Sequence, residues 1–212
     1  GLASSLHAKG FSVNDITDVL LTHLHFDHCG GAVEPYAMGG LRPTFPNATY
    51  WVSLPQWNWA MLPNRRERAS YLSENYLPLK ESGKLRFIEK ETVLAEGLSI
   101  RLFNGHTQGL IVPFIHYMNR TLVYLTDLIP TAAHIPLSWV CGYDTQPLIA
   151  MQEKENFLQE AFESAYILIF GHDIYTECCT LKQTEKGFRV DQTFSLGEFT
   201  GLPEAHEVAS IN

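Results

Sequence analysis

The sequence predicts a mixed α/β domain, because short apolar segments of strand length alternate with helical segments along the chain. Metal-ligand side chains directly follow several of these apolar segments, as expected where strands end at one edge of a sheet. The 212 residues are 45% hydrophobic and show no repeat or low-complexity tract. We therefore expect a single globular domain over residues 1–212.

Strands are predicted where apolar, β-branched and aromatic residues gather in short runs. These runs are Asp18–Leu21, Thr49–Ser53, Leu85–Ile88, Leu98–Phe103, Leu110–Tyr117, Thr121–Leu125, Tyr166–Phe170, and a final hairpin of Cys178–Thr184 and Phe188–Phe194. Helices are predicted where the spacing is amphipathic or where Pro and Gly mark an end. These segments are Leu2–Lys9 before Gly10, two helices within Pro55–Tyr76 divided by Pro63, and Pro147–Ser164.

The most informative local signal is THLHFDH at residues 22–28, directly after the first predicted strand. Imidazole nitrogens are the commonest metal ligands in proteins, and a carboxylate oxygen suits zinc, manganese or iron. His23 and His25 are two residues apart, so extended backbone directs both to one side, where they can share an ion. Asp27 and His28 follow after the chain begins to turn and are expected to reach a second ion.

Further ligands are needed, because four residues do not fill two coordination shells. Three more candidates each follow a predicted strand, and they are His106, Asp127 and His172. Strand ends on one rim of a sheet converge, so these residues and the first cluster are expected to form one site. Two ions held about 3.5–4 Å apart can activate a water between them.

These residues carry a family resemblance. The motifs are His23-x-His25-x-Asp27-His28, Gly105-His106-Thr107-x-Gly109, Asp127 and Gly171-His172. They occur in the order found in the metallo-β-lactamase-fold hydrolases. The chain resembles this family over nearly its whole length. The resemblance implies an αββα sandwich with two divalent ions at one edge, zinc being preferred and manganese or iron the alternatives. It implies one ion held by His23, His25 and His106, and another held by Asp27, His28 and His172. Asp127 would bridge the two ions.

The start of the chain differs from the family pattern. The family fold begins with several strands before the first metal motif, whereas only 22 residues precede His23 here. We therefore expect that the first N-terminal strands are absent from this chain and that an N-terminal portion of the domain is missing. A sandwich without those strands would leave an apolar face uncovered.

The resemblance also implies a mechanism. Two divalent ions stabilise hydroxide near neutral pH, and this nucleophile attacks a carbonyl or phosphoryl centre. Asp27 is expected to carry a proton to the leaving group, with pure ligation as the alternative. The ligand imidazoles need orienting partners, for which Asp18 and Thr22 are the nearby candidates.

Departures from other family members narrow the expected reaction. Zinc β-lactamases lack the bridging aspartate represented by Asp127, and the oxygen-reducing diiron flavoproteins carry glutamate where His25 stands. The pattern is closest to the N-acyl homoserine lactonases and methyl parathion hydrolase, although those lactonases carry a tyrosine where this chain has Pro130. We expect hydrolysis of a small ester, lactone or related substrate. The alternatives are a mononuclear iron thiol or persulfide dioxygenase, which His28 and His172 disfavour, and a non-catalytic metal-binding protein.

The substrate pocket is expected to be lined by aromatic side chains and by the long loop after Asp127, because pockets are commonly aromatic and long loops are commonly functional. Its proposed members are Phe26, Trp51, Trp57, His134, Trp139 and Tyr143. The tryptophans of the region after residue 50 are expected to form a lid over the metals. No metal role is expected for His7, His116 and His206.

Composition limits the partners. The net charge is −8, with 15 basic and 23 acidic residues, so the chain lacks the basic footprint of nucleic-acid binding. The cluster Arg65-Arg66-Glu67-Arg68 is interpreted as a solvated helix face. No apolar stretch approaches the ~20 residues that cross a bilayer, and four cysteines make no disulfide framework. We expect a cytoplasmic protein with a small-molecule substrate, and a homodimer is left open.

Overall fold

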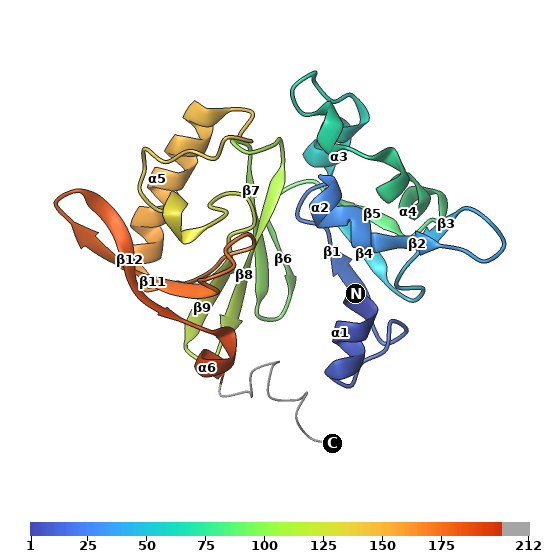
Figure 1. Cartoon of the computed structure of the whole chain (residues 1–212), viewed down its shortest axis with the longest axis horizontal. Coiled ribbons are helices and arrows are strands. Elements are labelled where there is room, and N and C mark those ends of the chain that lie inside the picture. Colours follow the sequence, from blue (N-terminus) through green and yellow to red (C-terminus); the bar gives the residue numbers. More distant parts are fainter. Residues whose placement is uncertain (201–212) are drawn as a thin grey trace. The chain divides into compact units, whose positions relative to one another are not determined.

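The computed structural model describes residues 1–200, and their contacts divide them into two compact units (Figure 1). Unit 1 contains residues 1–91 and 107–111, and unit 2 contains residues 92–106 and those from 112 onward. His206 lies outside the described residues. The single domain expected over residues 1–212 stays a prediction.

Unit 1 is built on a three-stranded parallel sheet in the order β1-β4-β5. These strands are β1 (Asp18–Leu20), β4 (Thr49–Ser53) and β5 (Leu85–Ile88). A separate antiparallel pair, β2 (Val33–Pro35) and β3 (Leu41–Pro43), was not expected from the sequence. Both strands have only three residues, and such short segments leave too little periodicity to detect.

The helices of unit 1 are short, and they are α1 (Leu2–Ala8), α2 (Phe26–Cys29), α3 (Leu54–Met61) and α4 (Leu77–Glu81). Ser53 caps α3, because its hydroxyl accepts a hydrogen bond from the Gln56 backbone N–H at 3.1 Å. The second helix expected after Pro63 is wrong, since Arg68–Ser70 and Ser73–Asn75 form two 3-10 turns. Where that helix was expected to begin, the chain forms a turn. In this turn Asn64 Oδ1 accepts hydrogen bonds from the backbone N–H groups of Arg66 and Glu67 at 2.9 and 3.1 Å.

Unit 2 contains a seven-stranded sheet in the order β12-β11-β10-β9-β8-β7-β6. Its strands are β6 (Thr92–Ala95), β7 (Leu98–Phe103), β8 (Leu110–Tyr117), β9 (Arg120–Tyr124), β10 (Ile167–Ile169), β11 (Cys178–Thr184) and β12 (Gly187–Phe194). The first two residues of β8 are grouped with unit 1. The β9–β10 pair is parallel, whereas β8–β9, β10–β11 and β11–β12 are antiparallel. Consequently the carboxyl ends of β9 and β10 lie on the same side of the sheet. Asp127 and His172 follow these two strand ends.

One long helix, α5 (Pro147–Glu163), packs on the sheet of unit 2 (Figure 1). Phe157 contacts Phe103 of β7 and Phe114 of β8 edge-on, with ring centroids 6.4 and 6.3 Å apart. The Arg101 guanidinium donates two hydrogen bonds to the Glu160 carboxylate at 2.6 and 2.7 Å. A short helix, α6 (Leu196–Thr200), follows β12.

The mixed α/β class predicted from the sequence is confirmed. Every predicted strand is present with its ends shifted by at most two residues, whereas β2, β3 and β6 and the short helices α2, α4 and α6 were missed. Among residues 1–200, none of the helices has the length and apolar character needed to cross a membrane. All four cysteines are free thiols.

Candidate functional site

The histidines of residues 22–28 lie together in unit 1, between β1 and the first turn of α2. The ring of His23 lies 4.6 Å from that of His25 and 4.1 Å from that of His28, measured between centroids. Leu21 and Leu24 anchor the segment in the unit 1 core, with 3% and 0% of their surfaces exposed. Core leucines thus alternate with ligand side chains and hold three imidazoles against one another.

Two of these imidazoles have a hydrogen-bond partner on one ring nitrogen. The Thr22 hydroxyl lies 3.3 Å from Nδ1 of His23, as expected for an orienting partner. Nε2 of His25 lies 3.0 Å from a Glu67 carboxylate oxygen. Asp18, the other expected partner, instead accepts a hydrogen bond from Nε1 of Trp51 at 2.7 Å. The expectation for Asp18 is therefore wrong, because its carboxylate links β1 to the neighbouring strand β4.

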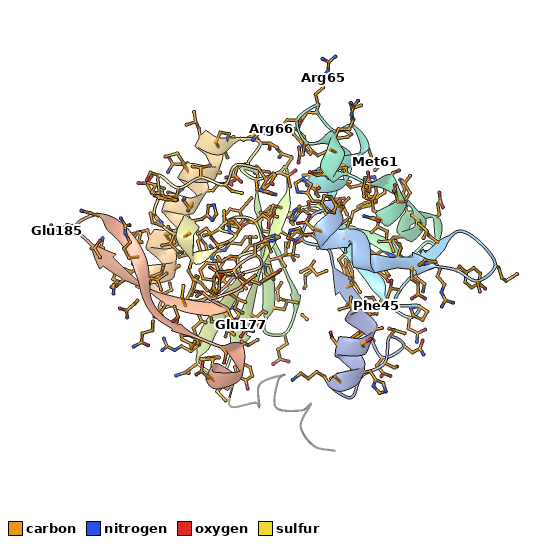
Figure 2. The ribbon with its side chains drawn as sticks, viewed as in Figure 1. Phe45, Met61, Arg65, Arg66, Glu177 and Glu185 are labelled. Carbon is orange, nitrogen blue, oxygen red and sulfur yellow. The ribbon has the colours of Figure 1, made fainter. Side chains whose placement is uncertain are left out.

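Glu67 was not recognised from the sequence, which indicated a solvated helix face. Arg65 and Arg66 do project outward from the turn after α3 (Figure 2), but Glu67 is only 3% exposed. Burial raises the pKa of this carboxyl group, yet hydrogen bonds from His25, Thr107, Trp59 and Tyr71 outweigh burial and lower the pKa from 4.5 to about 2. Glu67 is therefore a buried carboxylate directed at a candidate ligand histidine.

Asp27 and His28 begin α2 beside these rings. A carboxylate oxygen of Asp27 lies 3.4 Å from Nε2 of His28, and the side chains are 43% and 8% exposed, respectively. Asp27 stands in the first helical turn, where the backbone N–H groups favour a negative charge. Among the four candidate ligands of residues 22–28, Asp27 therefore has the most exposed side chain.

In unit 2, Asp127 lies between two histidines. One carboxylate oxygen is 3.0 Å from Nε2 of His106, and the other is 3.0 Å from Nε2 of His172. His106 and Asp127 are 3% and 8% exposed. A carboxylate whose two oxygens face different imidazoles has the arrangement expected of a ligand that bridges two ions.

Asp144 holds the other nitrogen of His106. Its carboxylate lies 3.0 Å from Nδ1 of His106, so the ring has a carboxylate on each side. Burial alone lowers the pKa of His106, but Asp127 and Asp144 together raise it to about 9. Cys141 also offers its sulfur within 4.8 Å of the ligand atoms of His106 and Asp144. Asp144 could not be recognised from the sequence, because it lies in an irregular loop 38 residues from its partner.

The segment before His106 is fixed by α5. Glu153 of this helix accepts the backbone N–H groups of Asn104 and Gly105 at 2.7 and 2.9 Å. A Cβ on Gly105 would lie 2.3 Å from the Ala150 Cα, so only glycine permits this close approach.

The segment before Asp127 carries backbone strain. Thr126 has a φ of 49° and is fully buried. This conformation is rare for a β-branched residue and is characteristic of functional sites.

The expected pocket residues lie in different surroundings. Trp57 is in the core of unit 1, where it contacts Tyr76 and Phe87 and is 4% exposed, so it offers no surface to a substrate. Trp51 is half-buried and bonded to Asp18. The expectation that these tryptophans form a lid is therefore wrong, because both side chains pack within unit 1. Phe26 remains 50% exposed at the start of α2.

The expected pocket residues of unit 2 lie on the loop after Asp127. Trp139 and Tyr143 are 62% and 80% exposed, and His134 is half-buried with Nδ1 2.7 Å from the Thr131 hydroxyl. Lys154 of α5 supports this loop by donating hydrogen bonds to the carbonyls of His134, Pro136 and Trp139 at 3.1, 3.1 and 2.8 Å. His134 and Trp139 line a small cavity with Cys141 and Asp144.

The donor set of each unit fits divalent ions. Three closely packed imidazoles would repel one another if all were protonated, whereas neutral rings present lone pairs to a cation. Thr22, Glu67 and Asp144 each contact one ring nitrogen of a candidate ligand histidine. The second ring nitrogen is then the one that can bind a metal ion. Imidazole and carboxylate are the ligands that zinc, manganese and iron share, so the donor set does not choose among these metals.

Comparison with known sequences gives one family and one group of relatives. A model of the metallo-beta-lactamase superfamily matches residues 1–172. An N-acyl homoserine lactonase of Bacillus thuringiensis is 25% identical over 181 residues, which are 83% of this chain and 63% of that protein. The N-acyl homoserine lactonase of Bacillus cereus is 24% identical over the same length. The chain thus spans less than two thirds of the length of these curated relatives.

Solved structures give similar matches. A probable metal-dependent hydrolase from Staphylococcus aureus is 27% identical with a TM-score of 0.80, covering 91% of this chain and 67% of that one. AidC, a dizinc quorum-quenching lactonase in complex with a product, is 26% identical with a TM-score of 0.78, covering 91% of this chain and 70% of that one. The hydrolase AbOPH, at 19% identity and a TM-score of 0.75, supports the similarity in fold alone.

Proposed function

Because this chain belongs to the metallo-beta-lactamase superfamily, we propose that it is a metal-dependent hydrolase of a small ester, lactone or related molecule. The fold of that superfamily, predicted from the sequence, is confirmed. The observation that carries the proposal is the Asp127 carboxylate, whose two oxygens face His106 and His172. It supports chemistry with two ions, because a ligand for a single ion has no need to present both oxygens to separate histidines.

The proposed ligands of the two ions are the seven residues of the family pattern. They are His23, His25, Asp27, His28, His106, Asp127 and His172. When bound, divalent ions such as zinc supply Lewis-acid activation of water and of the electrophilic oxygen. The family membership supports this set, and the contacts that orient the rings of His23, His25 and His106 support their roles as ligands.

Asp27 is proposed to transfer a proton as well as to bind metal. Its side chain is 43% exposed, whereas His28 beside it is 8% exposed, so the carboxylate can reach a substrate atom. A carboxylate beside the reacting water can accept its proton and deliver it to the leaving alkoxide. His134, Trp139 and Tyr143 are proposed to contact the rest of the substrate from the loop that Lys154 supports.

The substrate class follows from the relatives. N-acyl homoserine lactonases and a dizinc lactonase are similar to this chain at 24 to 26% identity, which supports ester and lactone bonds as the targets. Pro130 stands where we expect a tyrosine in such lactonases, so this chain departs from the lactonase pattern close to Asp127. Esters therefore belong in the substrate panel beside lactones.

The test is turnover of zinc-loaded protein with aryl esters, lactones of several ring sizes and a phosphotriester. We expect hydrolysis of at least one ester or lactone, and we expect Asp27→Asn to reduce kcat by about a hundredfold or more. Asp191→Asn, at an exposed position within β12, serves as the matched control and should leave turnover unchanged. Oxygen consumption by an iron-loaded protein that hydrolyses none of these compounds would contradict the proposal.

A further inference from the structure

We infer that Glu67 is a positioning residue that fixes the tautomer of His25, so that Nδ1 is the nitrogen that binds metal. The inference rests on the proposed function only for the presence of the ion. All of its geometry lies within unit 1. Glu67 follows His25 by 42 residues, so it lies outside the motif at residues 22–28.

The contact between the two side chains is short and shielded. Nε2 of His25 lies 3.0 Å from Oε1 of Glu67, and the side chains are 7% and 2% exposed. A carboxylate can only accept hydrogen bonds, so Nε2 must carry the proton. In a neutral ring the lone pair is then on Nδ1. The Thr22 hydroxyl at Nδ1 of His23 imposes a weaker choice, because a hydroxyl can donate or accept.

The carboxylate of Glu67 is held on both oxygens. Oε2 accepts hydrogen bonds from Nε1 of Trp59 at 2.7 Å and from Nδ2 of Asn64 at 3.0 Å. Oε1 accepts the Tyr71 hydroxyl at 2.9 Å in addition to His25. The Tyr71 ring also packs on the His25 ring, with centroids 4.9 Å apart. Glu67 is thus fixed in orientation, and His25 is fixed in turn.

This arrangement makes the Glu67→Gln substitution informative. Trp59 and Asn64 present only N–H groups to Oε2, so the amide oxygen of a glutamine must occupy that side. The amide NH₂ group then faces His25 and Tyr71, and the hydroxyl of Tyr71 can accept from it. A donor facing Nε2 of His25 requires the opposite tautomer, with the proton on Nδ1. The variant is therefore expected to reverse the tautomer with almost no change in side-chain volume.

The experiment measures that tautomer directly. Metal-free protein labelled with nitrogen-15 histidine is studied by long-range proton–nitrogen NMR correlation, in which the two tautomers give distinct patterns. We expect His25 to carry its proton on Nε2 in the wild-type protein and on Nδ1 in Glu67→Gln. Glu74→Gln, an exposed glutamate of the same unit, is the matched control and should match the wild type. A proton on Nδ1 in the wild-type protein would overturn the inference without any variant.

Zinc affinity supplies the second measurement. Competition with a chromophoric chelator should show that Glu67→Gln binds zinc about ten- to a hundredfold more weakly than the wild type, while Glu74→Gln is unchanged. Equal affinity in the wild type and Glu67→Gln would overturn the inference. Failure of the ester and lactone panel would overturn the proposed reaction alone, because neither the tautomer nor the zinc affinity is measured from turnover.

Discussion

Asp144 lies 3.0 Å from Nδ1 of His106, and both side chains are almost completely buried. The contact leaves Nε2 of His106 directed at Asp127, 3.0 Å away. A carboxylate on the far nitrogen of a ligand imidazole fixes the ring orientation and raises its basicity, and both effects favour a bound cation. Unit 2 therefore holds His106 in the manner in which Glu67 holds His25 in unit 1.

The first prediction concerns this contact. Asp144→Asn should weaken zinc binding by about ten- to a hundredfold, because an amide is a poorer acceptor for the His106 N–H than a carboxylate. Chelator competition on the metal-free protein measures the change. Asp191→Asn, which removes a surface carboxylate of β12 near Lys182, is the control. Equal zinc affinity in Asp144→Asn and the control would show that Asp144 does not orient a ligand.

The longer strands of unit 2 could be predicted from the sequence, because the residue pattern that predicts a strand is local. Leu98–Phe103 and Leu110–Tyr117 are long apolar runs, and their observed bounds agree with those expected. The three-residue strands Val33–Pro35 and Leu41–Pro43 could not be predicted in the same way. They pair with each other across a turn, and neither has enough residues to show a period of two.

The carboxylates behind the ligands could not be predicted, because their burial is a property of the folded chain. Glu67 is surrounded in sequence by arginines, which indicates solvent exposure, but its partners Trp59 and His25 come from other segments. Thr22 could be predicted, since it is adjacent to His23. The motif therefore predicts the candidate ligands, whereas an orienting group could be predicted only where it is a neighbour in the chain.

A second prediction tests the approach of α5 to the His106 segment. Gly105→Ala would place a Cβ 2.3 Å from the Ala150 Cα, which neither backbone can relieve without moving. We expect a loss of about 2–3 kcal/mol in the free energy of unfolding, measured by urea denaturation. Gly142→Ala is the matched control, because nothing lies within 4 Å of its added Cβ. Similar stabilities for the two variants would contradict the packing described here.

A third prediction concerns pH. The pKa of Glu67 is lowered from 4.5 in the unfolded chain to about 2 in the folded protein. A lowered carboxyl pKa contributes stability above pH 4.5 that is lost as the pH falls from 4.5 toward 2, and the full effect is about 3 kcal/mol.

The corresponding measurement is urea denaturation of metal-free protein between about pH 6 and about pH 3.5. The wild type should lose stability more steeply than Glu67→Gln over this range, because the glutamine cannot titrate. Parallel curves for the two proteins would show that the buried carboxylate does not titrate as expected.

A fourth prediction concerns the loop after Asp127. Lys154 donates to three carbonyls of this loop and is 3% exposed, and burial lowers its pKa to about 8. Near neutral pH the amine is therefore charged. Lys154→Met should cost about 2–4 kcal/mol of unfolding free energy, because three carbonyls of the loop lose the donor that they share. Hydrogen exchange should also rise in residues 134–141, whereas Lys182→Met, at an exposed site, should change neither quantity.

The central claim is that the protein binds two metal ions. The most direct test is a calorimetric titration of the metal-free protein with zinc, with elemental analysis of the saturated protein. Asp127 faces His106 and His172 with separate oxygens, so we predict two zinc ions per chain. Asp127→Ala should reduce the number of tightly bound ions. Saturation at a single zinc ion per chain would contradict the account.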